Sequence, residues 1–160
     1  MNAPITIHMD LTIHNPENAL DEIEKALSNK LEILAGKRLP DNVYRIDGTD
    51  ILYTFTDSVT HHEAPGAVAK LEQAPGHGPW EMGTLREAAL LIDHTKYNPA
   101  VDTEKHPGIK SEWAWLKDVY KSSSDCAWVV DFYTGGVDYG GRGLRCRALA
   151  VCRPVPASQK

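Results

Sequence analysis

The sequence lacks the features that mark several large classes of protein. No uncharged apolar run in its 160 residues approaches the roughly 20 residues of a membrane span. The N-terminal segment MNAPITIHMD has neither the basic stretch nor the apolar core of a secretory signal. Hydrophobic residues make up 42% and charged residues 24%, which is typical of a soluble domain and excludes collagen-like and globally disordered chains.

Cysteine is also scarce. The three cysteines, Cys126, Cys146 and Cys152, form no Cys-x-x-Cys pair, which argues against a zinc knuckle. An odd number of cysteines in a chain without a secretory signal argues against a disulfide framework. We therefore predict free, buried thiols.

Acidic residues are absent from the end of the chain. The net charge is −5, yet residues 139–160 hold five Lys and Arg residues and no acid. This asymmetry fits two arrangements: a basic strand against an acidic body, or a binding patch for an anionic group. The overall negative charge argues against nucleic acid as a partner, and an acidic body could instead meet a basic protein surface.

The first 38 residues predict a strand followed by a helix. Apolar and polar residues alternate over 5–13, which is typical of a half-buried strand. Asn15 is a suitable N-cap and Pro16 suits the first helical turn, so we predict a helix over 16–34 that stops at Gly36. Neither element can bury its apolar face alone, which favours self-association or docking onto the rest of the chain. The predicted self-association residues are Ile5, Ile7, Leu20, Ile23 and Leu27.

The rest of the chain is predicted to form short strands and helices. A capping box, Thr84-Leu85-Arg86-Glu87, opens a predicted helix over 85–93. Trp128, Val130 and Phe132 alternate onto one face of a strand that is followed by a Thr134-Gly135-Gly136 hairpin turn. The predicted strands are 42–46, 51–56, 127–133, 137–139 and 144–153, and a further short helix is predicted over 67–73.

Several segments from residue 78 onward carry a family resemblance. They are Pro79-Trp80, the run Thr84 to Ala88, the segment Leu91 to Asp102, the segment around Trp113 and Trp115, the run Cys126 to Val137, and the ending Arg145-Cys146-Arg147-Ala148-Leu149-Ala150-Val151. In this order they resemble the DUF1566 family, which includes the C-terminal domain of the Legionella collagen-like adhesin. The ending is most similar to short phage-borne and prophage-borne members.

This resemblance implies an α+β fold of the C-type-lectin-like kind, related to the formylglycine-generating enzymes, over residues 39–154. Residues 1–38 are then a strand–helix appendage and residues 155–160 a tail. It also implies a non-enzymatic protein from a phage or prophage that binds a host or phage protein. Because the sequence has no recognisable secretory signal or membrane span, we expect it to act in the host cytoplasm or the virion, with no membrane partner. Two roles stay open: an inhibitor of a host anti-phage defence component, and a virion, tail-receptor or adhesin-like recognition module. A formylglycine-generating-enzyme-like oxidase is a distant third alternative.

Candidate catalytic and metal sites are few. His61, His62, Glu63 and His77 could bind a metal, but their spacing fits no standard motif. The formylglycine-generating enzymes use a cysteine pair with copper, whereas Cys146 and Cys152 would lie about 20 Å apart on a continuous strand. We find no catalytic triad and no phosphate loop, so we predict no cofactor, no metal and no enzymatic activity.

The predicted partner-binding surface lies at the tips of the last strands. Exposed Tyr and Arg residues beside a glycine-rich tip favour protein contacts, although an ordinary hairpin tip has the same composition. In addition, Leu116-Lys117-Asp118 follows Trp115 where the resembling family has Ser or Thr. The candidate residues are Tyr133, Tyr139, Arg142, Arg145, Trp115, Lys117 and Asp118.

Overall fold

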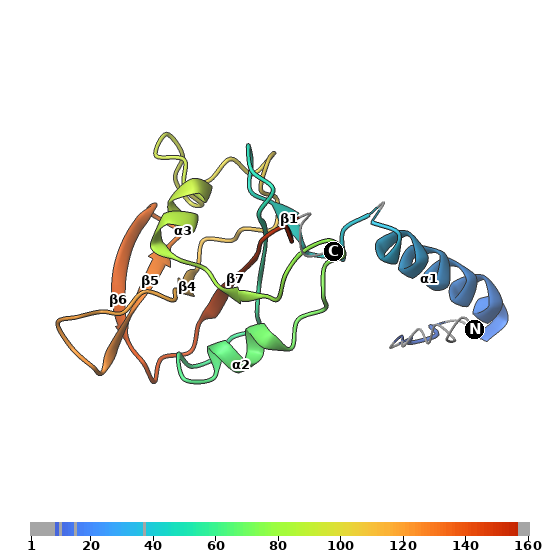
Figure 1. Cartoon of the computed structure of the whole chain (residues 1–160), viewed down its shortest axis with the longest axis horizontal. Coiled ribbons are helices and arrows are strands. Elements are labelled where there is room, and N and C mark those ends of the chain that lie inside the picture. Colours follow the sequence, from blue (N-terminus) through green and yellow to red (C-terminus); the bar gives the residue numbers. More distant parts are fainter. Residues whose placement is uncertain (1–8, 10, 15, 37, 157–160) are drawn as a thin grey trace. The chain divides into compact units, whose positions relative to one another are not determined.

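The structure, a computed structural model, describes residues 9, 11–14, 16–36 and 38–156 (Figure 1). It divides the chain into two compact units, Met1–Arg38 and Leu39–Lys160. In the first unit, Met9 and residues 11–13 form no strand, so the strand prediction is wrong for this part of 5–13. The physical reason is that no described strand pairs with it, and an unpaired strand leaves its backbone groups without partners. Ile5 and Ile7 lie outside the described residues.

The predicted helix of the first unit is confirmed. A 3-10 turn, Pro16–Asn18, leads into α1 (Ala19–Leu34). Gly36 has a φ of +69°, the left-handed conformation that commonly ends a helix. The predicted N-cap Asn15 lies outside the described residues, and Asn18, the residue before α1, makes no side-chain capping bond.

The second unit is built on one mixed sheet of seven strands (Figure 1). Its path runs β1-β2-β7-β4-β5-β6, with β3 also paired to β7. The β4–β7 pair is parallel and the other pairs are antiparallel. The strands are β1 (Tyr44–Arg45), β2 (Leu52–Phe55), β3 (Glu81–Met82), β4 (Trp113–Trp115), β5 (Cys126–Asp131), β6 (Gly136–Gly141) and β7 (Arg147–Cys152); the helices are α2 (Ala64–Ala69) and α3 (Leu85–Leu91).

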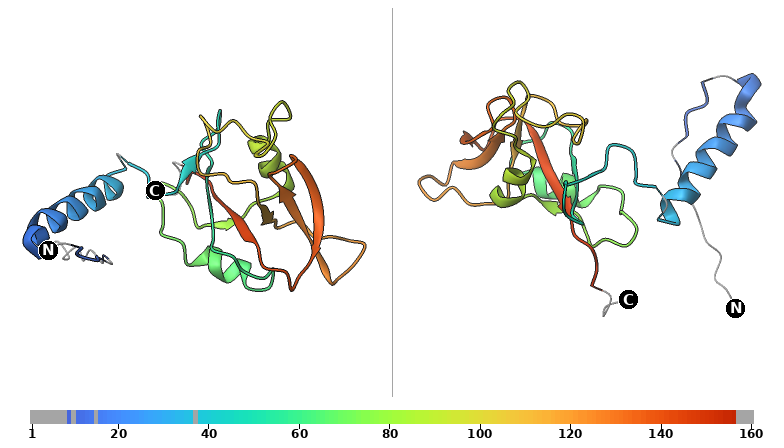
Figure 2. Two further views of the ribbon diagram at one scale, coloured as in Figure 1. Left: turned by 180° about the vertical axis from the view of Figure 1, so that it is seen from behind. Right: turned by 90° about the horizontal axis from the view of Figure 1, so that it is seen from above.

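Side-chain alternation gives the sheet a core on each face. On β5, Val130 packs in one core with Trp128 and Phe132, as predicted, while Ala127 and Val129 belong to the other. Ala88 and Leu91 of α3 pack in the first core, and Ala64 and Val68 of α2 pack in the second. Figure 2 shows the same ribbon from two further sides. The α+β class is therefore correct, and the C-type-lectin-like assignment stays a prediction. No helix in the described ranges is long and apolar enough to cross a membrane.

Several element boundaries differ from the predictions. The helix predicted over 67–73 is α2, which begins earlier because Pro65 suits a first helical turn. The hairpin turn spans residues 132–135, and Gly135 has a φ of +82°, so the turn includes the predicted Thr134 and Gly135 but begins two residues earlier, and Gly136 belongs to β6. The strands β3 and β4 were not predicted, since two or three residues are too few to show alternation.

The predicted capping box at α3 is present. The Glu87 amide donates to the Thr84 hydroxyl at 3.3 Å, and the Thr84 amide donates to the Glu87 carboxylate at 2.9 Å. Replacing Thr84 with Ala is expected to lower the free energy of unfolding by about 1 kcal/mol, because one helix amide loses its acceptor. Urea denaturation measures this change, with Thr103→Ala, at an exposed turn, as the control. Equal stabilities of the two variants would contradict the capping role.

A buried histidine makes stability depend on pH. His106 is 3% exposed, and its Nδ1 lies 3.1 Å from the Tyr53 hydroxyl. Burial lowers the pKa of His106 below its usual 6.5, although Asp47 and Asp102 act in the opposite direction. The unfolded chain therefore binds more protons, so the stability that neutral His106 contributes is lost as pH falls through 6.5 toward the folded-state pKa.

We expect the free energy of unfolding to fall between pH 7.5 and 5.5, by at most about 1.4 kcal/mol per pH unit for each such proton. Denaturation curves at both pH values should show a smaller fall for His106→Asn than for the wild-type chain. Exposed His62→Asn is the control for the removal of a histidine. An unchanged slope in His106→Asn would show that another group controls the pH dependence.

Candidate functional site

The candidate site lies where the parallel strands β4 and β7 separate. They pair at Ala114 with Arg147 and at Trp115 with Ala148. Before this point the two chain segments diverge. The segment before β4 follows β5, since the Phe132 amide donates to the Glu112 carbonyl at 3.2 Å. The segment before β7 turns to the other side, where the Cys146 amide donates to the Val59 carbonyl at 3.0 Å.

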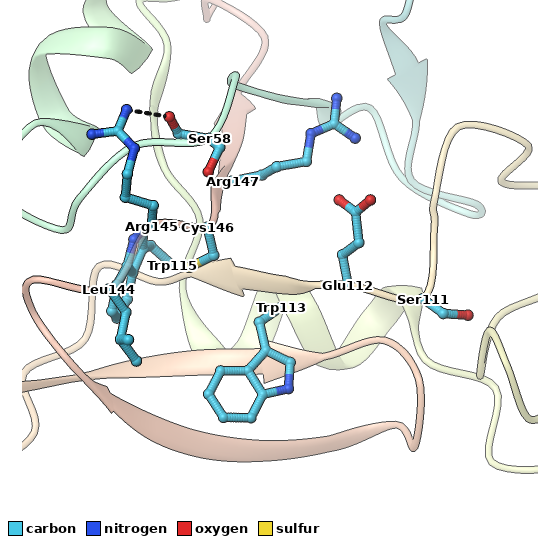
Figure 3. A pocket seen from close by; sticks show the side chains of 9 residues that line it. All are labelled: Ser58, Ser111, Glu112, Trp113, Trp115, Leu144, Arg145, Cys146 and Arg147. Atoms are coloured by element: carbon cyan, nitrogen blue, oxygen red, sulfur yellow. Dashed lines mark hydrogen bonds between the residues drawn. The ribbon is translucent and has the colours of Figure 1, made fainter.

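This divergence leaves a groove around Arg147. One cavity of about 540 Å³ is lined by Ser58, Ser111, Glu112, Trp113, Trp115, Leu144, Arg145, Cys146 and Arg147 (Figure 3). A second cavity of about 390 Å³ is lined by Asn42, Tyr44, Thr54, Phe55, Asp57, Pro107, Gly108, Lys110 and Arg147. A small void of about 10 Å³ shares Glu112 and Trp113 with the first and Phe55 and Lys110 with the second. We call these three together the Arg147 groove.

The first cavity has an apolar side. Trp113 is 38% and Leu144 53% exposed, and both extend to the same side in Figure 3. Both lie near Gly140 of β6. A β-carbon at Gly140 would lie 3.3 Å from Leu144 Cδ1, 3.5 Å from the Trp115 ring and 3.7 Å from Trp113 Cζ3. Only the Leu144 contact would be tighter than ordinary van der Waals contact, so the absence of a side chain here matters for Leu144.

The opposite side of this cavity is charged. The side chains of Arg145, Arg147 and Glu112 extend away from Trp113 (Figure 3). Arg145 is engaged, since its guanidinium donates to the Ser58 carbonyl at 2.7 Å and to the Glu63 carboxylate at 3.2 Å. Arg147 donates through Nε to the Thr56 carbonyl at 3.0 Å and lies 5.3 Å above the Phe55 ring. Among the described residues, its two terminal nitrogens have no hydrogen-bond partner, so they can bind a ligand carboxylate.

The cysteines, of which Cys146 lines this groove, are not poised for nucleophilic chemistry. All three cysteines are free, but only Cys152 is fully buried; Cys126 and Cys146 are partly exposed. Burial raises the pKa of Cys146 to about 12 and that of Cys152 to about 11. Both groups are therefore protonated near neutral pH, and the thiolate is the reactive form.

Comparison with known protein families identifies the domain. Residues 28–153 match the Lcl C-terminal domain family. The chain belongs to this family. It is the DUF1566 family, so the predicted resemblance is confirmed. No curated protein gives a significant match to the chain.

The Lcl C-terminal domain match extends beyond the second unit. It begins at residue 28, inside α1, so the family match includes the end of the helix in the first unit. The family is adhesin-like and is not a known enzyme family. In this member, the Arg147 groove combines exposed apolar side chains with charged ones, which suits binding.

The residues predicted from sequence to bind a partner do not form one surface. Tyr133 lies in the β5–β6 turn, with its ring 4.7 Å from that of Tyr97. Tyr139 stacks on Tyr120 with the ring centroids 4.5 Å apart. Arg142 is at the other end of the β5–β6 hairpin from Tyr133, where its Nε donates to the Cys126 carbonyl at 3.2 Å. A hairpin of this length separates its two ends by about 17 Å.

Three further candidates, residues 115, 117 and 118, lie in β4 or just after it. Trp115 is fully buried and its indole N–H donates to the Val59 carbonyl at 3.0 Å, so its assignment to an exposed surface is wrong. Asp118 accepts a 2.7 Å hydrogen bond from the Leu85 amide at the start of α3, which is a structural role. Lys117 lies 3.8 Å from the Glu81 carboxylate, beside a different pocket. Of the seven candidates, only Arg145 and Trp115 line the Arg147 groove.

The basic end of the chain is largely engaged by the acidic body. Arg153 pairs with Glu81 at 2.6 Å and with the buried Glu87, and Arg145 pairs with Glu63. The histidines considered as ligands lie in separate places: His61 packs against Trp115, and His77 contacts the Pro75 and Asp50 carbonyls. In the ranges that the structure describes, no group of three or more ligating side chains could hold a metal.

Sequence reasoning missed most of the groove. Trp113, Leu144 and Arg147 were not selected as site residues, although Trp113-x-Trp115 has the spacing that places two side chains on one strand face. The alternation did not show which tryptophan would be covered. That depends on Val59 and His61, which are distant in sequence and contact Trp115.

Proposed function

We propose that this chain is a non-enzymatic binding module that recognises a protein partner through the Arg147 groove. The observation that carries the proposal is the combination of half-exposed Trp113 and exposed Leu144 in the first cavity with Arg147, which lines all three cavities of the groove and whose terminal nitrogens have no hydrogen-bond partner among the described residues. Tryptophan and arginine dominate the energetics of protein interfaces when they lie in a pocket that excludes water. An apolar side chain of the partner would contact Trp113 and Leu144 while a carboxylate binds Arg147.

The chemistry of the groove supports a protein rather than a purely anionic polymer. Lys110 and Arg147 stand beside Asp57 and Glu112, and Arg145 is neutralised by Glu63. A groove with both signs of charge and an apolar side favours a segment that also has both polar and apolar groups. The phage or prophage setting, the host cytoplasm or virion as the place of action, and inhibition of a host anti-phage defence component belong to this proposal through the sequence resemblance.

A second candidate is recognition of a surface ligand. The observation that favours it is membership of the Lcl C-terminal domain family, which is adhesin-like. In this alternative the same groove serves a virion, tail or adhesin-type module, and the partner is a surface component instead of a cytoplasmic protein.

Co-purification tests the proposal and separates the two candidates. The full chain and its Trp113→Ala variant are each captured from infected host cells, and the associated proteins are quantified by mass spectrometry. We expect a host protein that the wild-type chain retains and the variant loses. Enrichment of virion proteins would favour the second candidate, and identical protein sets from both chains would contradict binding through the groove.

A further inference from the structure

The apolar face of α1 is not part of the proposed binding site. Six large aliphatic side chains lie along this helix. Ile33 is buried, and the other five are at least 36% exposed; they are Leu20, Ile23, Leu27, Leu31 and Leu34. We call them the α1 stripe. At 100° per residue they occupy a sector of only about 80°, which is narrower than the sector that a helix usually buries against a globular domain.

The spacing of the stripe is that of a helix pair. Successive members are three, four, four and three residues apart, which averages 3.5 residues. A repeat of 3.5 residues keeps an apolar seam facing a second helix of the same kind. The series is also symmetric about Leu27. In an antiparallel pair with its two-fold axis at Leu27, Leu20 would oppose Leu34 of the second copy and Ile23 would oppose Leu31.

The charges of the helical segment favour the antiparallel orientation. Within α1, the first half contains Asp21, Glu22 and Glu24 with a single Lys25, and the second half contains Lys30 with a single acid, Glu32. An antiparallel arrangement therefore sets the acidic half of one helix at the same level as the neutral half of the other. It also opposes the two helix dipoles, whereas a parallel arrangement would set like charges at the same level.

We propose that the α1 stripe binds a second copy of this chain as an antiparallel helix pair. This inference is independent of the Arg147 groove and goes beyond the proposed function, since it would bring two grooves into one assembly. The helix is about 24 Å long, so the contact is a small one, and we expect a dissociation constant on the order of 10–100 µM.

Sedimentation of the full chain tests the pairing. Over about 1–500 µM we expect a monomer–dimer equilibrium for the wild-type chain, and a weakening of at least about tenfold in Leu27→Glu, because a carboxylate would face its own copy at the two-fold axis. Lys25→Gln is the matched control, since it gives the same change in net charge on the opposite side of α1 and should dimerise normally. A monomeric wild-type chain, or a dimer that Leu27→Glu leaves intact, would overturn the proposal.

A mixing experiment guards against a simple loss of helix in the variant. Leu27→Glu and Leu27→Lys chains should each be monomeric and should form a mixed dimer when combined, because opposite charges then meet at the axis. If the mixture stays monomeric while the helix content measured by circular dichroism is retained, the pairing through Leu27 is wrong. If the Leu27→Glu and Leu27→Lys chains lose their helix content, a Leu27→Ala chain is measured in their place. A dimer affinity of Leu27→Ala equal to that of the wild-type chain would overturn the proposal.

Cysteine crosslinking tests the orientation. We expect Leu20→Cys and Leu34→Cys chains, mixed and oxidised, to give a disulfide between the two introduced positions that peptide mass spectrometry identifies. Leu20→Cys alone should give no such product between its own copies, which the antiparallel arrangement places roughly 20 Å apart. The chain with its native cysteines only is the background control. Efficient crosslinking of Leu20→Cys to itself would overturn the antiparallel arrangement.

Discussion

A Trp115→Ala chain is expected to lose about 3–5 kcal/mol of folding free energy, the largest change we expect from a single substitution. Trp115 is fully buried among Ala127, Val129 and Ala148, and its removal would leave a cavity in the core on the α2 face of the sheet. The substitution would also leave the Val59 carbonyl without its indole donor. Since domains are stable by only about 5–15 kcal/mol, this loss is a large part of the total.

Chemical denaturation of the wild-type and variant chains measures this effect. Trp115→Phe is the first control, because it keeps an aromatic ring but removes the indole N–H, and it should cost clearly less than Trp115→Ala. Trp113→Ala is the second, because Trp113 is partly exposed on the same strand face and should cost less than about 1.5 kcal/mol. Similar losses for Trp113→Ala and Trp115→Ala would refute the assignment of one tryptophan to the core and the other to the groove.

The second large effect is on binding. Trp113→Ala is expected to weaken the affinity for the co-purified protein partner by about thirtyfold or more, which corresponds to about 2 kcal/mol. The reason is that Trp113 is 38% exposed and, together with Leu144, forms the apolar side of the first cavity. Titration calorimetry with the purified partner measures the affinity, and thermal denaturation of the variant confirms that it is folded.

The controls for this measurement are the residues that the sequence suggested first. Tyr139→Ala and Arg142→Ala alter exposed side chains on and after β6 that do not line the groove. Both should bind within about twofold of wild type. Loss of affinity in these two variants, with none in Trp113→Ala, would return the partner surface to the hairpin tip.

Local sequence signals predicted the elements that depend on local physics. The periodicity of Leu20 to Leu34 predicted α1, and the hydroxyl of Thr84 with the carboxylate of Glu87 predicted the start of α3. The alternation of Trp128, Val130 and Phe132 predicted the face that β5 presents to one core. Each of these signals acts between residues that are at most four apart, so the chain alone carries them.

The groove could not be predicted in this way because it arises from pairing between distant segments. It requires β7 to pair in parallel with β4 at Ala114 and Arg147, and residue 146 to turn toward Val59. The residues near 147 show no pattern that would identify β4 or Val59 as the segment with which they pair. The strand predicted over 144–153 includes β7 but begins three residues too early. If residues 144–146 had continued the strand, they would have filled the gap that the first cavity occupies.

Site-specific photo-crosslinking tests most directly whether the Arg147 groove is the partner surface. A photoreactive amino acid is placed at Leu144, at the apolar side of the groove, or at Tyr97, which is 65% exposed and lines none of the described groove cavities. After irradiation in infected host cells, we expect a crosslinked protein partner from position 144 and none from position 97. A crosslink from position 97 alone, or no difference between the two positions, would contradict binding through the groove.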